Sequence, residues 1–169
     1  LDDALVAAET FIQSDSSVVK VAAALSMPEF SYTGFCDKGS TLPGLSDWIE
    51  QLIAESTGKL GLGVLPVVLA TDSSELASAP ADLLVAKIYA EATEATGDEV
   101  AVSGVLGAQF LLWEYATVVA SRLIGINPFD QPDVESAKIA ARGMLEQRDA
   151  VIPAQFENSG IEVRTTSLE

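Results

Sequence analysis

The sequence predicts an α/β protein in which a doubly wound parallel sheet of about four or five strands is flanked by helices. Short apolar runs over 64–70 and 83–89, rich in β-branched residues, are typical of strands covered by helices on both faces. Longer segments with helical periodicity alternate with them. Because 49% of the 169 residues are hydrophobic, the chain can bury a sizeable core.

The first half of the chain begins with helices expected over 1–12 and 18–25, which are rich in alanine and valine and separated by a turn-prone Ser-Asp segment. A short strand is expected over 30–35. From Leu45 the apolar residues recur at helical spacing, which predicts an amphipathic helix ending at Gly58. Its apolar positions are Leu45, Trp48, Ile49, Leu52 and Ile53.

The second half is expected to contain two longer helices. Residues 104–124 are apolar almost all round, which predicts a central, buried helix. Residues 130–147 predict a second helix with Pro132 near its first position and acidic residues in its first turn. The tail over 153–169 is only loosely specified.

The excess of acidic over basic residues restricts the kinds of partner that the chain can bind. Nine Lys and Arg against 25 Asp and Glu give a net charge of −16, which argues against nucleic acid and anionic membrane surfaces. The apolar stretch 105–126 is not expected to span a membrane, because Gln109, Glu114 and Arg122 interrupt it. Nucleic acid and membrane are therefore not expected as partners.

The chain lacks histidine and carries a single cysteine, Cys36, so a disulfide framework and most zinc or haem sites are excluded. No metal or cofactor is expected, Cys36 is expected to be unreactive, and a reducing, cytoplasmic compartment fits best. The sequence predicts one domain over 1–169. It opens at Leu1 without Met, so we expect it to be a piece of a longer protein, called here the parent protein.

The first candidate cluster lies at the end of the helix that starts at Leu45. Gln51 and Glu55 are one helical turn apart, so they face the same way. In the last helical turn the negative end of the helix dipole disfavours the carboxylate of Glu55, which is expected to raise its pKa. Such a group can act as a general base. The alternative is an ordinary solvated glutamate at a helix edge.

The second cluster begins the helix expected over 130–147. Lys138 lies within an apolar stripe of that helix, where a lysine is unusual. One interpretation places its ammonium in a cleft, and the other is a side chain that extends to solvent. Gln131, at the helix start, lies near free backbone N–H groups that suit an anionic ligand such as a sugar phosphate.

Other candidate residues are weaker. Gly58, Gly61 and Gly63 follow a helix at a spacing that matches neither a P-loop nor a dinucleotide-binding motif, so nucleotide binding is not expected. Glu114 can be catalytic, but a buried glutamate with a structural partner is the more common case.

Two segments together resemble glucose-6-phosphate isomerase, in the carboxy-terminal half of its short bacterial form. The segment GLSDWIEQLIAESTGKLGLGVLPVV is similar to the one that carries the catalytic glutamate of that family. The segment GAQFLLWEYATVVASRLIGINPFDQPDVESAK is similar to its carboxy-terminal signature. The resemblance covers roughly residues 20–142.

The resemblance implies that Glu55 moves a proton between C1 and C2 of the sugar through a cis-enediol, and that Lys138 assists ring opening. Gln51, Gln131 and Thr57 are the implied substrate-binding residues. The family fold is a pair of flavodoxin-like sugar-isomerase domains, of which this chain resembles the second. The implied enzyme is a homodimer that interconverts glucose 6-phosphate and fructose 6-phosphate in glycolysis and gluconeogenesis, without metal or cofactor.

The sequence also departs from the family pattern. Asp133 stands where glycine is usual, Ala137 stands where glycine is frequent, and the histidine used in ring opening is absent. The serine-rich phosphate loops belong to the first sugar-isomerase domain, so this chain alone is expected to be inactive. The alternatives are a non-catalytic phosphosugar-binding module and a structural fragment whose acidic surface confers solubility.

Overall fold

A computed structural model describes residues 2–13, 15–97, 99–146 and 152–165. The chain divides into two compact units, Leu1–Gln131 and Pro132–Glu169, which are described separately below. The expected single domain over 1–169 stays a prediction.

The first unit is built on a four-stranded parallel sheet with strand order β2-β1-β3-β4. The strands are β1 (Tyr32–Lys38), β2 (Pro66–Val68), β3 (Leu83–Tyr89) and β4 (Glu99–Ser103). In the central register, Phe35 of β1 lies between Val68 of β2 and Ala86 of β3. The sheet and its flanking helices confirm the predicted α/β class and are consistent with a flavodoxin-like doubly wound fold.

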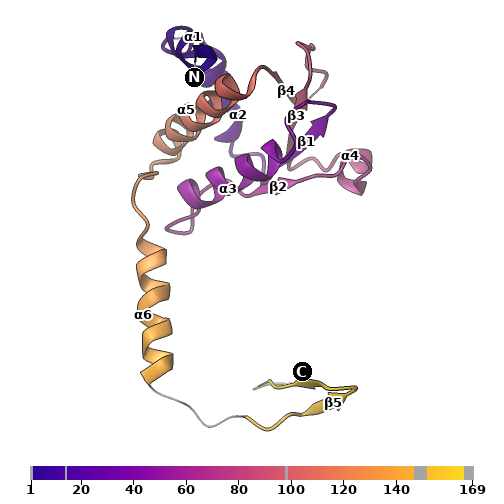
Figure 1. Cartoon of the computed structure of the whole chain (residues 1–169), viewed down its shortest axis with the longest axis vertical. Helices are drawn as coiled ribbons and strands as arrows, with labels where there is room; N and C mark the ends of the chain where they lie inside the picture. Colours follow the sequence, from indigo (N-terminus) through magenta and orange to yellow (C-terminus); the bar gives the residue numbers. More distant parts are fainter. Residues whose placement is uncertain (1, 14, 98, 147–151, 166–169) are drawn as a thin grey trace. The chain divides into compact units, whose positions relative to one another are not determined.

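Five helices accompany the sheet (Figure 1). They are α1 (Asp2–Phe11), α2 (Ser17–Leu25), α3 (Leu45–Thr57), α4 (Ser74–Ser78) and α5 (Leu106–Ile124). Helices α2, α3 and α5 bury their apolar sides in one large cluster against the sheet. A smaller cluster contains Cys36, Leu69 and Leu83, with Leu76 of α4 packed against it. Residues Phe35 and Cys36 are adjacent in β1 and therefore point to opposite faces, so each cluster covers one face of the sheet.

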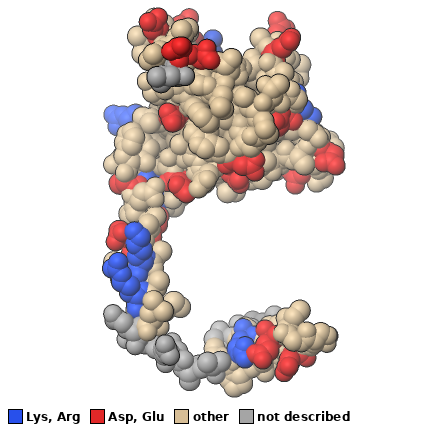
Figure 2. Space-filling view, in the orientation of Figure 1, with Lys and Arg blue, Asp and Glu red and all other residues tan. Residues whose placement is uncertain are grey.

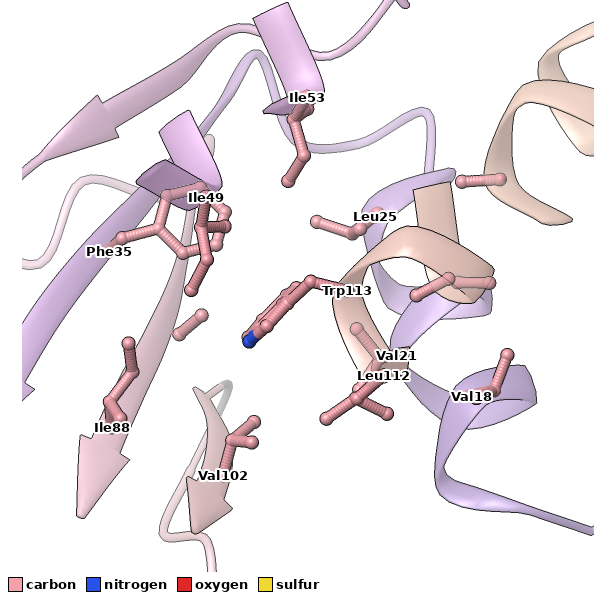
Figure 3. Close-up of a cluster of buried hydrophobic side chains, with 14 of the residues drawn as sticks. Val18, Val21, Leu25, Phe35, Ile49, Ile53, Ile88, Val102, Leu112 and Trp113 are labelled. Carbon is pink, nitrogen blue, oxygen red and sulfur yellow. The ribbon is translucent and has the colours of Figure 1, made fainter. Parts of the chain in front are cut away.

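Trp113 of α5 lies at the centre of the larger core (Figure 3). Its fully buried indole meets Phe35 edge to face, with ring centroids 5.5 Å apart and planes at 83°. Such a pair adds about 0.5–1.5 kcal/mol beyond the burial of its area. This contact fixes α5 against β1.

Helix α5 is central but not buried all round, which corrects one expectation. Its buried residues lie on one side, and Glu114 is exposed on another. The apolar residues Tyr115 and Val118 are also partly exposed, at 38% each. Glu114 is therefore not the buried structural glutamate that the sequence suggested.

Two elements of the first unit were not predicted. Strand β4 is a five-residue stretch that follows a polar loop, and pairing with β3 defines it. Helix α4 has only five residues, too few to show helical periodicity.

The second unit contains α6 (Pro132–Glu146) and a hairpin of β5 (Phe156–Asn158) and β6 (Ile161–Val163). Ser159 and Gly160 turn the hairpin with φ of 52° and 80°, as a two-residue turn with left-handed backbone requires. The hairpin lies in the tail that the sequence left loosely specified. Figure 2 shows basic side chains gathered on α6, whereas acidic ones are spread over the first unit.

None of the helices in the described ranges has the length and apolar character needed to cross a bilayer. The same ranges contain no cluster of three or more His, Cys, Asp or Glu side chains that could hold a metal ion.

Candidate functional site

The first candidate cluster lies on the last turns of α3. The side chains of Gln51 and Glu55 are both exposed, and the Gln51 amide donates a hydrogen bond from Nε2 to Glu55 Oε1 at 3.1 Å. The spacing of four residues places both side chains on one face of the helix, as the sequence predicts, and allows this contact. One carboxylate oxygen of Glu55 is thereby held by an amide group.

Thr57 ends α3 and is 1% exposed. Its hydroxyl donates to the backbone oxygen of Ile53 at 2.8 Å and accepts from the backbone N–H of Val64 at 3.0 Å. These bonds connect the end of α3 to the segment that enters β2. The geometry therefore favours a positioning role for the Thr57 side chain, and substrate binding by Thr57 stays a prediction.

Gly63 allows the loop between α3 and β2 to close against the helix. Its φ is +118°, and a Cβ atom there would lie 2.5 Å from the backbone oxygen of Thr57. Only glycine fits this conformation at this distance. Gly63 thus has a structural role in closing this loop.

Lys59 belongs to this site, although its role could not be predicted from the sequence. It is 4% exposed, and its Nζ donates to the backbone oxygen of Asn127 at 2.8 Å. The same ammonium contacts Asp130 twice, at its backbone oxygen and at Oδ1, the latter at 3.1 Å. Lys59 therefore joins the loop after α3 to the loop after α5, two segments about 70 residues apart.

This junction determines where Gln131 lies. Gln131 follows Asp130 directly, and its Nε2 donates to the backbone oxygen of Glu55 at 3.5 Å. The structure thus brings together Gln51, Glu55 and Gln131, three of the predicted site residues. The only sequence signal for Lys59 was a lysine in a stretch otherwise composed of small and apolar residues, from Gly58 to Leu65.

Lys138 belongs to the second unit, on α6. Its side chain is 55% exposed and forms an ion pair with Glu135 at 3.0 Å, one turn earlier on the same helix. Within the unit its ammonium is in solvent, and the apolar stripe around it is exposed too, including Val134 at 42%. The role of Lys138 in ring opening stays a prediction.

Cys36 is fully buried in β1. Burial raises the pKa of its thiol, and the nearby ammonium groups of Lys38 and Lys87 only partly oppose this effect. A thiol with a raised pKa remains protonated and is a poor nucleophile. Cys36 is therefore unsuited to nucleophilic chemistry, as the sequence predicts.

Comparison with known proteins adds to the fold but not to the site. No family model and no curated protein matches the sequence. Among solved structures, the chain is similar to the hypothetical protein TT0462 from Thermus thermophilus, with a TM-score of 0.70 and 21% identity. The match covers 86% of this chain and 49% of that one, so the chain spans about half the length of its structural neighbour. At this identity the likeness establishes the fold alone.

Proposed function

We propose that this chain supplies the carboxy-terminal part of a glucose-6-phosphate isomerase, the enzyme that interconverts glucose 6-phosphate and fructose 6-phosphate. The proposal starts from the resemblance of two sequence segments to that family. The observation that carries it is the arrangement at the end of α3, where the Gln51 amide bonds the Glu55 carboxylate and the Gln131 amide bonds the backbone oxygen of Glu55.

In the proposed reaction Glu55 acts on the open-chain sugar. Its carboxylate takes the proton from C2 of the aldose while O1 gains a proton, which gives a cis-enediol. The proton is then returned to C1 while the O2 hydroxyl loses its proton, which gives the ketose. The reverse reaction follows the same path. The exposed position of Glu55 supports this role, because a general base must come within hydrogen-bond reach of the proton that it removes.

Gln51 and Gln131 act as amide donors beside Glu55. The bond from Gln51 restricts the rotation of the carboxylate and leaves the second oxygen available. The weaker contact of Gln131 with a backbone oxygen leaves its amide able to turn toward a bound sugar phosphate. Lys59 and Thr57 are positioning residues in this proposal.

Other parts of the reaction are assigned to residues away from α3. Ring opening is assigned to Lys138, as the resemblance implies, together with a partner outside this chain, because the chain contains no histidine. Phosphate binding is assigned to the first sugar-isomerase domain of the parent protein. We further propose that the parent protein is a cytoplasmic homodimer that needs no metal or cofactor.

The test is direct observation of turnover. The parent protein, produced in a host from which the endogenous isomerase has been deleted, is incubated with glucose 6-phosphate, and fructose 6-phosphate is followed by NMR. Turnover by the parent protein and none by the 169-residue chain is the expected result. A rise in melting temperature with sugar phosphates but no turnover would instead support a binding module. The absence of both binding and turnover would refute the proposal.

A further inference from the structure

Strand β4 leaves one edge of the sheet open. It pairs with β3 and has no second neighbour in the part of the chain that the structure describes. In a strand, alternate residues direct their backbone N–H and C=O groups to each side, so β4 presents unpaired groups along its free edge. Exposed edges are usually protected by lysine, proline or a bulge. The sequence of β4, EVAVS, has neither lysine nor proline.

A groove of about 810 Å³ runs along this edge. One wall is the continuous stretch 99–105, which includes all of β4, and residues from both faces of the strand line it. The other walls come from α1, α2 and α5, with apolar side chains such as Phe11, Val21 and Leu112. A groove lined by the whole length of an edge strand offers backbone hydrogen bonds as well as apolar contacts.

One end of the groove carries unsatisfied donors. Helix α5 begins there, after Val105, with no side-chain cap and no acidic residue in its first turn. The first N–H groups of a helix have no partner within the helix, and the helix dipole makes this end positive. An anionic group is therefore favoured at this end of the groove.

Gln109 adds a second, independent donor at the same end. Its side chain is 1% exposed and lines the groove. Its Oε1 accepts a hydrogen bond from Trp113 Nε1 at 3.0 Å, whereas its Nε2 has no partner among the described residues. This Nε2 points toward the turn between β4 and α5, 3.8 Å from the position that a Cβ on Gly104 would occupy. A buried amide without an acceptor is costly, so an acceptor is expected there when the groove is filled.

We propose that this groove binds the carboxy-terminal segment of an extended peptide, which adds to the sheet as a fifth strand parallel to β4. All pairs in the sheet are parallel, so an added parallel strand continues its pattern. In that direction the peptide ends beside the carboxyl end of β4, where the first turn of α5 and Gln109 meet its terminal carboxylate. Strand addition and capture of a terminal carboxylate are both general modes of peptide recognition.

The groove also defines the chemistry of the peptide. Because β4 has five residues, about five peptide residues can pair with it. Alternate side chains face the apolar wall formed by Val21 and Leu112, so apolar residues are expected at every second position. Lys20 and Asp3 both line the groove and offset each other, and Glu99 is paired with Lys87, so the lining favours a peptide that is uncharged apart from its terminal carboxylate. The groove is built from elements other than α3, so the inference does not depend on the proposed isomerase function.

Peptides modified at the backbone test strand addition. The probe is the N-acetylated pentapeptide Thr-Val-Thr-Val-Ala with a free carboxyl terminus, titrated into the 169-residue chain and followed by calorimetry. Two derivatives carry N-methyl groups on alternate amides, one on the odd set and one on the even set. Only one set can face β4, so one derivative should bind like the unmodified peptide and the other at least about tenfold more weakly. No binding of the unmodified peptide, or equal binding of the two derivatives, would overturn the proposal.

The carboxylate end is tested separately. The same peptide with a terminal amide should bind at least about tenfold more weakly than the free acid. The Gln109→Glu variant keeps an acceptor for Trp113 but replaces the donor by a carboxylate, so it should lose affinity for the free acid more than for the amide. Equal affinity of the wild-type chain for acid and amide would overturn the proposed direction. The comparison of the two peptides does not depend on the stability of the variant.

Discussion

Replacement of Lys59 by methionine is expected to destabilise the first unit and release Gln131 from α3. Methionine keeps most of the length of the side chain but removes the ammonium group. The change deletes the contacts of Nζ with the backbone oxygens of Asn127 and Asp130 and with the Asp130 carboxylate. Those contacts are the connection between the loop after α3 and the loop after α5.

The expected loss of stability follows from the groups that lose their partner when the ammonium is removed. A hydrogen bond from a charged group contributes about 1.5–3 kcal/mol, and breaking a fully buried ion pair costs about 3–5 kcal/mol. The Asp130 side chain is 55% exposed, so water can solvate its carboxylate after the change, and the upper range does not apply. We therefore expect Lys59→Met to lower the free energy of unfolding by about 2–4 kcal/mol.

Urea unfolding of the 169-residue chain measures this effect. Lys20→Met is the matched control, because Lys20 is exposed and the same charge is removed. It should change the free energy of unfolding by less than about 0.5 kcal/mol. Asp130→Asn keeps the two backbone oxygens and should cost less than Lys59→Met. If Lys59→Met and Lys20→Met have the same stability within about 0.5 kcal/mol, the role given to Lys59 is wrong.

Three further predictions concern other parts of the chain. Gly63→Ala should lower the free energy of unfolding by about 2–4 kcal/mol, because the new Cβ would collide with backbone atoms. Gly61→Ala, with open space around it, should lower it by only about 1 kcal/mol. Thermal unfolding compares the two variants, and equal losses of stability would contradict this reasoning. Burial raises the pKa of Glu99, but hydrogen bonds from Lys87 and Thr96 outweigh this effect and hold the pKa below its ordinary value. The ionised Glu99 therefore stabilises the fold above about pH 4.3, and this stabilisation is lost as the pH falls through the folded-state pKa. In urea unfolding, Glu99→Gln should therefore be destabilising at about pH 6 and much less so at about pH 2.5, and an equal cost at both pH values would refute this. Lys138→Ala in the parent protein should slow the turnover of cyclic substrate by about a hundredfold or more and affect open-chain substrate less, and equal losses would remove the ring-opening role.

The hydropathy pattern predicted helices and strands of the first unit closely where the buried residues of an element recur at helical or strand spacing. The strand expected over 83–89 is β3, and the helix expected from Leu45 ends at Thr57 with Gly58 as its cap. The strand expected over 30–35 was displaced, since β1 runs to Lys38. Asp37 and Lys38 follow the predicted strand, and pairing with β3 extends β1 through them.

The contact that assembles the candidate site could not be predicted from local pattern. The helical spacing of Gln51 and Glu55 predicted that they face the same way, and the structure adds the hydrogen bond between them. The position of Gln131 depends instead on Lys59 and Asp130, which are 71 residues apart in the sequence. No periodicity links such residues, and a lysine after a helix is usually exposed. Lys59 is buried by tertiary packing alone.

The central claim, that Glu55 is the base of an aldose–ketose isomerisation, is tested most directly by isotope exchange in the parent protein. In D₂O, the wild-type protein should incorporate deuterium at C2 of glucose 6-phosphate through the enediol, and NMR of the recovered sugar measures the rate. Glu55→Gln preserves shape and polarity but cannot accept the proton, so its exchange should be slower by about a hundred- to ten-thousand-fold, whereas Glu50→Gln, on the same helix, should exchange like the wild type. Exchange by Glu55→Gln at a rate near that of the wild type would contradict the account, because another residue would then be the base.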